Sequence, residues 1–301
     1  MSEATGEEAK TIHRLLEIGK IEDDKIHNVD VNLTSIDSDV VVVDEMSMVD
    51  CFLMNYILRA IYNGSKLILV GDSNQLPSVG PGSVLKDLIE SEFVSCVSLN
   101  KIFRQAAKSK IIVNSHNVNN GISFITNHEY EDDQEDDFYY INEQSQENML
   151  NQVVSLCNGR LKKFGNYDFF RCIQVLTPTK KGSLGTKELN NKLQEVLNPK
   201  SSKKQEKQMG SCCFREGDRV MQIKNNYDIY WERGDTKYNF EEFETGSGIF
   251  NGELGIINKI DNQDKAIEVE FDDEKKAWYS FSELDELELA YAITIHKAQR
   301  K

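Results

Sequence analysis

A run of four valines at residues 40–43, followed at once by an Asp-Glu pair, constrains the fold of this chain more than any other feature. Consecutive β-branched residues of this kind suit a strand that is buried on both faces, as the strands of parallel sheets are. A second apolar run at residues 67–70 is followed by a Gly-Asp pair, and apolar residues repeat at helical spacing over residues 52–60 between the two runs. Strand, helix and strand in this order predict an α/β fold with a parallel sheet.

Acidic residues follow both apolar runs: Asp44 and Glu45 come after the first, and Gly71 and Asp72 after the second. If the strands are parallel, these residues lie together at the carboxyl edge of the sheet, where α/β folds bind ligands. A strand that ends in Asp-Glu is the Walker B pattern, in which the Asp holds Mg²⁺ and the Glu orients or deprotonates the attacking water. Taken alone, the pattern fits a polar loop after a core strand about equally well.

Spacing and turn residues predict several further elements. Apolar residues on one face indicate a short helix that contains Ile12 and Leu15, and Ser83 is a candidate cap for a later helix. The remaining expected elements are a strand at 97–99, helices within 111–161, a strand at 173–176, a helix at 189–196 and a linker at 199–210.

The sequence pattern changes at residues 214–281, which contain short runs in which apolar and polar residues alternate. Over residues 267–271, for example, Ile, Val and Phe alternate with Glu, which is typical of a half-buried strand. The pattern predicts a small all-β barrel that contains a long polar loop at residues 230–248. A last apolar strand at residues 289–295 is expected to return the chain to the α/β sheet.

Composition narrows the class of protein. The net charge of −15 argues against a simple DNA-coating protein, whose grip is mostly electrostatic, but it is compatible with a local basic track. No apolar run is long enough to span a membrane, and no secretory signal is found near the start. The six cysteines are scattered without a CxxC pair, which argues against a zinc site or a disulfide framework and predicts a cytoplasmic protein.

Five sequence blocks resemble, in the family's order, motifs of the RecD-like superfamily-one DNA helicases, which include the alpha subunit of exodeoxyribonuclease V. The blocks are DEMSMVD at residues 44–50 (motif II), GDSNQLPSV at 71–79 (motif III), LNKIFRQ at 99–105 (motif IV), TPTKKGSLGT at 177–186 and AYAITIHKAQ at 290–299 (motif V). The resemblance covers nearly the whole chain, because residues 2–17 are similar to the family's segment just after motif Ia.

The resemblance implies two motor domains with RecA-like parallel sheets of the P-loop NTPase type. Residues 1–103 are expected to form the first of these domains, with an incomplete sheet. Residues 104–210 together with 282–301 are expected to form the second. The β-rich segment at residues 211–281 resembles the SH3-like barrel inserted in RecD-type enzymes, which helps to hold the tracking strand.

With ATP and Mg²⁺ as the implied cofactors, the resemblance places six residues at the nucleotide: Asp44, Glu45, Gly71, Asp72, Gln75 and Arg104. Of these, Asp44 is expected to bind Mg²⁺ and Glu45 to act as the catalytic base. Gln75 is expected to sense the γ-phosphate and link it to DNA. Arg104 is expected to reach the γ-phosphate from the second motor domain and to stabilise transition-state charge.

The same resemblance implies a set of single-stranded DNA contacts: Thr294, His296, Lys297 and Gln299 in motif V, with Lys180, Lys181 and Thr186 as further phosphate contacts. Relatives move 5′ to 3′ on single-stranded DNA and unwind duplexes in recombination and repair. The implied partners are therefore single-stranded DNA, duplex ends and the other subunits of a recombination nuclease complex, with no membrane.

Two of the family's motifs are not found. The P-loop, GxxxxGK[ST], does not occur in the sequence, and neither does motif VI. Motif V also departs from the family at Ala298, where Ser is usual, and at Arg300 and Lys301, which stand where Gly-Ser-Glu normally continues. Because the P-loop amides and Lys hold the phosphates, we expect a fragment that binds ATP weakly and does not unwind DNA alone.

Three alternatives remain open at this point. A non-catalytic module that binds single-stranded nucleic acid predicts salt-dependent binding that Asp44→Ala does not change. A Mg²⁺-dependent nuclease that uses Asp44, Glu45 and Asp72 predicts strand cleavage without ATP. An inert fragment predicts neither activity.

Overall fold

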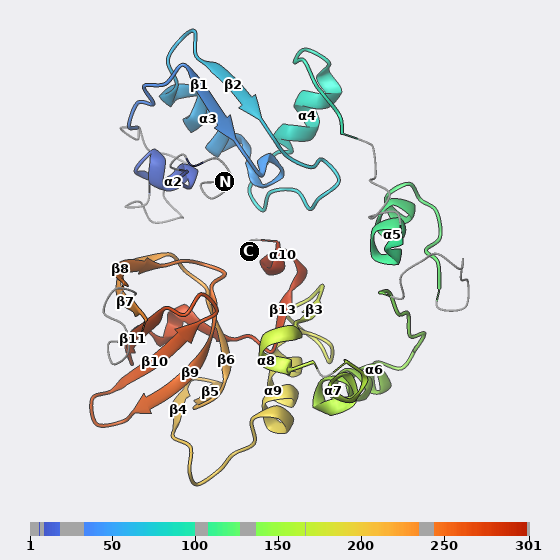
Figure 1. Cartoon of the computed structure of the whole chain (residues 1–301), viewed down its shortest axis with the longest axis vertical. Coiled ribbons are helices and arrows are strands. Elements are labelled where there is room, and N and C mark those ends of the chain that lie inside the picture. Colours follow the sequence, from blue (N-terminus) through green and yellow to red (C-terminus); the bar gives the residue numbers. More distant parts are fainter. Residues whose placement is uncertain are drawn as a thin grey trace. The chain divides into compact units, whose positions relative to one another are not determined.

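The computed structural model describes residues 6, 9–18, 33–99, 108–126, 137–165, 167–234 and 244–299. The chain divides into two compact units, residues 1–140 and 141–301, which we call the first and the second unit (Figure 1). Within the described residues, no helix has the length and apolar character needed to cross a membrane.

The first unit is built on two parallel strands, β1 (Val40–Val43) and β2 (Lys66–Leu69), so the parallel pairing predicted from the sequence is confirmed. Helix α3 (Cys51–Ala60) connects them, and α4 (Val84–Ser91) follows β2. Helix α3 starts at a well-defined cap, because Oδ1 of Asp50 accepts a hydrogen bond from the amide of Leu53 at 2.8 Å. The expected helix near Ile12 is the single turn α2 (Ile12–Leu15).

The core of the first unit lies on one side of this sheet. Val41 and Val43 are buried in a cluster with residues of α3 and α4, whereas Val40 and Val42 are 48% and 47% exposed. The expectation that β1 is buried on both faces is therefore wrong for the part of the chain described. The second face of the strand is exposed because no described element of the unit covers it.

Two other expectations for the first unit need correction. Residues 97–99 form no strand, and Val97 and Leu99 are 86% and 94% exposed, since no described strand lies beside them. Ser83 does occupy the N-cap position of α4, but its side chain makes no capping hydrogen bond. Further along, α5 (Lys110–Asn119) is capped by Ser109, and the carboxylate of Asp137 accepts hydrogen bonds from the Ser109 hydroxyl and the Lys110 amide.

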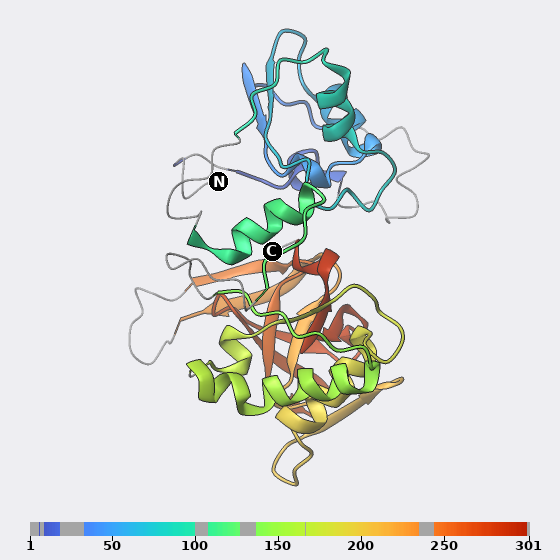
Figure 2. The ribbon, with the colours of Figure 1, turned by 90° about the vertical axis from the view of Figure 1, so that its right-hand side faces the viewer.

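The second unit contains a helical part and a small parallel sheet. The helical elements are α6 (Gln146–Ser155), a π-helical turn (Leu156–Arg160), α7 (Leu161–Gly165), α8 (Phe169–Cys172), α9 (Thr186–Leu197) and α10 (Ile295–Ala298). Strand β3 (Val175–Thr177) pairs in parallel with β13 (Ala292–Thr294), which confirms the expected return of the chain to an α/β sheet. Helices α6 and α9 lie side by side in both ribbon views (Figures 1 and 2).

Between α9 and β13 the chain forms an antiparallel seven-stranded sheet in the order β12-β6-β9-β10-β11-β7-β8. Its strands are β6 (Arg219–Gln222), β7 (Asn226–Arg233), β8 (Glu244–Ile249), β9 (Leu254–Asp261), β10 (Ala266–Phe271), β11 (Lys276–Ser280) and β12 (Leu287–Leu289). The predicted alternation of buried and more exposed side chains along β10 is confirmed, with Ile267, Val269 and Phe271 buried in the core.

Two segments expected to be irregular are in fact strands. The segment at 230–248 was expected as a polar loop, but β7 and β8 pair there as an antiparallel hairpin, and its residues 235–243 lie outside the described part of the chain. The expected linker at 199–210 contains β4 (Glu206–Met209), which pairs with β5 (Cys212–Arg215). Both pairs are rich in polar residues that alternate with partly buried ones, so their composition resembles that of a loop.

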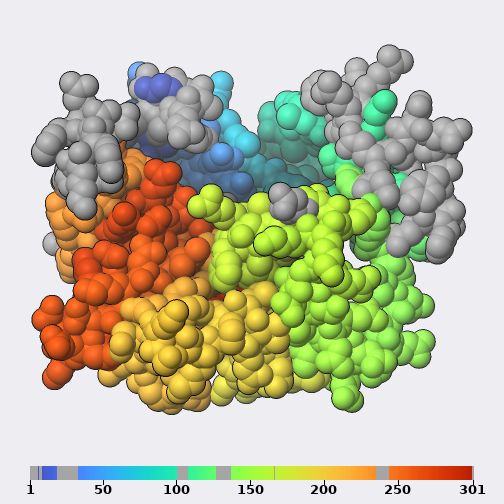
Figure 3. Space-filling view, turned by 60° about the horizontal axis from the view of Figure 1, so that its bottom comes forward, coloured from blue at the N-terminus to red at the C-terminus, as the bar shows by residue number. Residues whose placement is uncertain are grey.

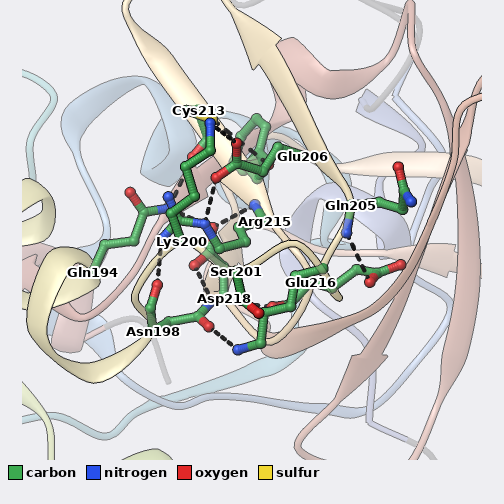
Figure 4. A network of polar contacts seen from close by, with 12 residues as sticks. Gln194, Asn198, Lys200, Ser201, Gln205, Glu206, Cys213, Arg215, Glu216 and Asp218 are labelled. Atoms are coloured by element: carbon green, nitrogen blue, oxygen red, sulfur yellow. Dashed lines mark hydrogen bonds and ion pairs between the residues drawn. The ribbon is translucent and has the colours of Figure 1, made fainter.

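A buried polar network joins the end of α9 to the two-stranded β4–β5 sheet and to the residue just before β6 (Figure 4). Its centre is the fully buried Asp218, whose carboxylate accepts hydrogen bonds from Gln194 (2.6 Å), Asn198 (2.7 Å) and the amide of Arg215 (2.7 Å). Arg215 in turn forms an ion pair with Glu206 at 2.6 Å.

The segment near residue 200 (gold) lies directly against the C-terminal strands of the seven-stranded sheet (orange-red) on the face seen in Figure 3.

Candidate nucleotide and nucleic-acid sites

The carboxyl ends of β1 and β2 lie together, as their parallel register requires. The amide of Val70 donates to the carbonyl of Val43 at 2.8 Å, and the amide of Met46 donates to the carbonyl of Val70 at 3.0 Å. These two hydrogen bonds bring the segment that contains Asp44 and Glu45 beside the segment that contains Gly71 and Asp72. We call this the acidic edge.

Asp44 and Glu45 turn sharply away from β1. Oδ1 of Asp44 accepts a hydrogen bond from the amide of Glu45 at 2.9 Å, and Glu45 has a φ of 55°, in the left-handed region that residues other than glycine rarely adopt. Both side chains are exposed, and no described residue forms an ion pair with either of them. Their carboxylates are therefore available to groups that arrive from solvent. Strained backbone of this kind is concentrated at functional sites.

The loop after β2 is held against the start of α3. Oδ1 of Asp72 accepts from the amide of Asn74 at 2.9 Å, and the amide of Gln75 donates to the carbonyl of Asp72 at 3.3 Å. Gly80 lies so close to Asp50 that a β-carbon added at Gly80 would come within 1.8 Å of Oδ2 of Asp50. The loop is thereby fixed, and the exposed Gln75 stands in the tight turn that follows the acidic edge.

The donor set at the acidic edge suits Mg²⁺ held jointly with a phosphate. Among the described residues, no three His, Cys, Asp or Glu side chains are grouped closely enough to enclose a metal. Mg²⁺ usually needs only one or two carboxylates, because waters and substrate phosphate oxygens complete its shell. The exposed carboxylate of Asp44 fits that arrangement. Arg104 lies outside the described residues, as does the rest of motif IV after Leu99, so the role expected for Arg104 stays a prediction.

The loop at residues 177–186 is wound tightly by its own hydrogen bonds. The hydroxyl of Thr177 donates to the carbonyl of Leu184 at 2.6 Å, and the amide of Thr186 donates to the carbonyl of Thr179 at 3.1 Å. Gly185 is needed for this winding, because a β-carbon there would lie 2.7 Å from the backbone of Lys180. The loop places Lys180 and the start of α9 next to each other.

Four of the seven expected DNA-contact residues surround one small hollow in the second unit. Its lining comprises Lys180, Thr186, Asn190, Met221, Glu288, Leu289, Ala292, Ile293, Thr294 and Lys297. The elements that contribute to it are the 177–186 loop, α9, β6, β12, β13 and α10. The other three expected residues, Lys181, His296 and Gln299, do not line the hollow, and the first two are exposed.

Comparisons with known proteins agree with this architecture. Residues 189–271 match the family model described as the SH3 domain of ATP-dependent RecD-like DNA helicases, and residues 1–134 match an AAA domain model. The ATP-dependent RecD2 DNA helicase of Deinococcus radiodurans is 31% identical over 299 residues, which are 99% of this chain and 35% of that protein. The chain belongs to the RecD-like helicase family.

Other relatives point the same way. The RecBCD enzyme subunit RecD of Buchnera aphidicola is 26% identical to this RecD-like chain over 97% of the chain and 52% of that protein. The chain thus spans about a third to a half of the length of these relatives. Among solved structures, a Bacteroides Pif1 helicase in complex with ADP-AlF3 and single-stranded DNA matches 95% of this chain and 69% of that one, with 19% identity and a TM-score of 0.44. The parallel pairs β1–β2 and β3–β13 and the match to the SH3 domain model confirm an α/β fold with parallel sheets and an SH3-like insertion.

Sequence reasoning missed the residues that position motif V in this RecD-like chain. The side chain of Asn190 donates to the carbonyls of Leu289 (2.8 Å) and Ala292 (3.1 Å) and accepts from the amide of Ala292 (2.7 Å). Gln174 donates to the carbonyl of Tyr291 at 3.2 Å. The only sequence signal was an Asn on the buried face of α9, beside Leu189, where an apolar residue is usual.

Asp218 is a third positioning residue that the sequence did not reveal. Its carboxylate accepts a hydrogen bond from the hydroxyl of Tyr291 at 2.8 Å, just before β13. Burial raises the pKa of Asp218, although the hydrogen bonds donated to it partly offset that effect. Burial also raises the pKa of Tyr291, so its hydroxyl keeps the proton that it donates.

Proposed function

We propose that this chain carries two parts of an ATP-dependent RecD-like DNA helicase, a nucleotide-hydrolysis edge in the first unit and a grip on single-stranded DNA in the second. The observation that carries the proposal is the parallel pairing of β1 and β2. It sets the Asp-Glu pair of motif II beside the first residues of motif III, as a shared nucleotide site requires.

In this proposal, ATP binds with Mg²⁺ at the acidic edge. Bound Mg²⁺ neutralises the charge that develops on the phosphate oxygens. Asp44 presents its exposed carboxylate to the metal, and Glu45, turned outward by its left-handed backbone, orients and deprotonates the attacking water. Gln75 is the residue that contacts the γ-phosphate from the fixed loop after β2, with Gly71 and Asp72 beneath it.

The second unit is proposed to hold the DNA backbone. Lys180, Thr186, Thr294 and Lys297 surround the hollow, where ammonium and hydroxyl groups can bind phosphate oxygens. The exposed Lys181 and His296, with Gln299, are proposed to extend this track along the strand. Movement 5′ to 3′, unwinding of duplex ends, partner subunits of a recombination nuclease and a cytoplasmic location belong to the same proposal. All six cysteines are free thiols in the structure.

The division into motor domains is also a proposal. We assign residues 1–103 to the first motor domain, residues 104–210 and 282–301 to the second, and residues 211–281 to the SH3-like insertion. Strand β12 (Leu287–Leu289) falls in the range assigned to the second motor domain but pairs with β6 in the seven-stranded sheet of the insertion. The insertion and the second motor domain are thus joined through this strand.

The test is to measure single-stranded DNA binding and ATP hydrolysis by the purified chain, with Glu45→Gln and Lys180→Ala as variants. We expect DNA binding that weakens as salt rises and that Lys180→Ala reduces, because each phosphate contact contributes to the salt dependence. Glu45→Gln should leave this binding unchanged. DNA-stimulated ATP hydrolysis that Glu45→Gln removes would contradict the prediction from sequence that the chain alone binds ATP weakly and does not unwind DNA. It would also extend the proposal to the isolated chain.

A second candidate, a non-catalytic module for single-stranded nucleic acid, is favoured by one observation: the hollow and all of its lining lie within the second unit. In that case DNA binding is independent of Mg²⁺-nucleotide at any concentration, and Asp44→Ala has no effect. Strand cleavage that requires Mg²⁺ but no ATP would instead support a nuclease that uses Asp44, Glu45 and Asp72.

A further inference from the structure

The hollow contains an acidic residue that none of the motifs explains. Nζ of Lys297 lies 2.9 Å from Oε2 of Glu288, and the Lys297 side chain is 19% exposed whereas that of Glu288 is 50% exposed. Both residues line the hollow. The lysine that the proposed function assigns to a DNA phosphate is therefore already bound to a carboxylate of the same chain.

The other groups of the hollow favour an anion. Thr294 is 93% buried, being 7% exposed, and its side chain makes no capping hydrogen bond at the start of α10. Helix α9, 12 residues long, begins at Thr186, so its amino end brings partial positive charge to the lining. Lys180 adds a second ammonium group, and Glu288 is the one acidic side chain among the lining residues.

Glu288 combines a fixed backbone with a movable side chain. It belongs to β12, where it stands opposite Met221 of β6, so the strand ladder holds its main chain. Its side chain is half exposed and, within the described residues, has Lys297 as its ionic partner. Ion pairs as exposed as this one are weak, so the side chain can leave Lys297 at small cost.

We propose that Glu288 is a built-in competitor for DNA phosphate: in the free chain its carboxylate occupies the position at Lys297 that a backbone phosphate takes when DNA is bound. The inference rests on the proposed function of the hollow. Carboxylate and phosphate both offer oxygen acceptors to an ammonium group, and either one can satisfy Lys297. Each time a phosphate leaves, Glu288 closes on Lys297 again, which weakens the grip and favours release of the strand.

A purely structural role for Glu288 predicts the opposite sign. If the carboxylate only orients Lys297 toward DNA, then its removal loosens Lys297 and weakens DNA binding. If the carboxylate competes, then its removal frees Lys297 and strengthens DNA binding. The measured direction of the change therefore separates the two roles.

The experiment is a titration of a fluorescein-labelled oligo(dT) with the complete chain, followed by anisotropy at several KCl concentrations. Glu288→Gln keeps the size of the side chain and removes its charge. The matched control is Glu195→Gln, which removes one negative charge from a similar pair with Lys192 (3.2 Å) on α9, away from the hollow. We expect Glu288→Gln to tighten binding about two- to fivefold relative to the control, the strength of an exposed ion pair.

A double-mutant cycle with Lys297→Met sharpens the result. If Glu288 competes for Lys297, Lys297→Met must weaken binding more in the Glu288→Gln background than in the natural chain. In that background it should also reduce the salt slope by about 0.7, the value for one phosphate contact on a single strand. Equal melting temperatures of the variants establish that the fold is retained.

Three results overturn the inference. Binding by Glu288→Gln that equals or falls below that of the control excludes competition, and so does additivity in the cycle. In both cases salt-dependent binding by the natural chain leaves the proposed function standing. If neither the natural chain nor any variant binds oligo(dT), the proposed DNA grip itself fails, and the inference fails with it.

Discussion

The acidic edge of the first unit and the hollow of the second are held in place by different means. The acidic edge depends on main-chain pairing between strands β1 and β2. On one face of this sheet, the side chains of Val40 and Val42 are about half exposed. The hollow depends on buried polar side chains, chiefly Asn190 and Asp218, that reach residues far away in the sequence. Distant side-chain substitutions should therefore damage the second site much more than the first.

The largest effect is expected for Asp218→Ala. Four buried donors would lose their acceptor, and an unsatisfied buried group costs roughly 1–3 kcal/mol, so we expect the free energy of unfolding of the second unit to fall by about 3–5 kcal/mol. Both tryptophans, Trp231 and Trp278, lie in this unit, so urea unfolding followed by tryptophan fluorescence measures it selectively. Asp218→Asn, which keeps the shape, should lose less. An unchanged midpoint in Asp218→Ala would contradict the comparison.

A somewhat smaller loss is expected for Asn190→Ala. The amide and carbonyl of Ala292 and the carbonyl of Leu289 would be left without a partner inside the fold, which should cost about 2–3 kcal/mol. DNA binding should weaken too, because β13 is part of the motif V block. The neighbouring Asn191 is exposed on the same helix, so Asn191→Ala is the matched control and should change neither property. Equal effects of the two variants would remove Asn190 from the positioning residues.

In the first unit, the corresponding test is Gly80→Ala. The new β-carbon would collide with Asp50, so we expect a loss of about 1–3 kcal/mol, confined to the first unit. In urea unfolding followed by far-UV circular dichroism, the transition of the first unit should move to a lower urea concentration. The transition followed by tryptophan fluorescence should stay unchanged. Adding Asp50→Ser, which shortens the side chain and keeps a helix cap, should recover part of the lost free energy of unfolding. A shift of the tryptophan transition would show that the two units do not unfold independently.

The last prediction concerns the reactivity of the cysteine thiols and involves no substitution. Burial raises the pKa of Cys157 and of Cys212 to about 11, so both thiols stay protonated at neutral pH. Because the thiolate is the nucleophile, alkylation by iodoacetamide should be slow at pH 8 and rise roughly tenfold per pH unit towards pH 10. Mass spectrometry of the labelled peptides should show the exposed Cys96 of the first unit reacting ahead of both. Early labelling of Cys212 would mean that the start of β5 opens readily.

Sequence alone was sufficient for elements whose pattern is local. The valine run and the acidic residues after it predicted β1 and the acidic edge, and the alternation at residues 266–271 predicted β10. The roles of Gly71, Gln75, Thr294 and Lys297 come from motif resemblance and stay predictions. In each case the information lies within about ten consecutive residues.

Elements that depend on distant partners could not be predicted in this way. The contacts of Asn190 and Gln174 with residues 289–292 join residues 99 to 117 positions apart. Hairpin β7–β8 is rich in charged residues, so its composition suggested a loop until its pairing was known. The exposure of Val40 and Val42 likewise reflects what covers a sheet, which a strand's own residues do not encode.

The connection between the seven-stranded sheet and strand β13 is very short. Strand β12 ends at Leu289 and β13 begins at Ala292, so Ala290 and Tyr291 form the whole connection, and both are fully buried. A connection without exposed residues has no hinge, and Tyr291 is further anchored by Asp218. A displacement of β13 must therefore move the adjoining edge of the seven-stranded sheet with it, because β12 is an edge strand of that sheet.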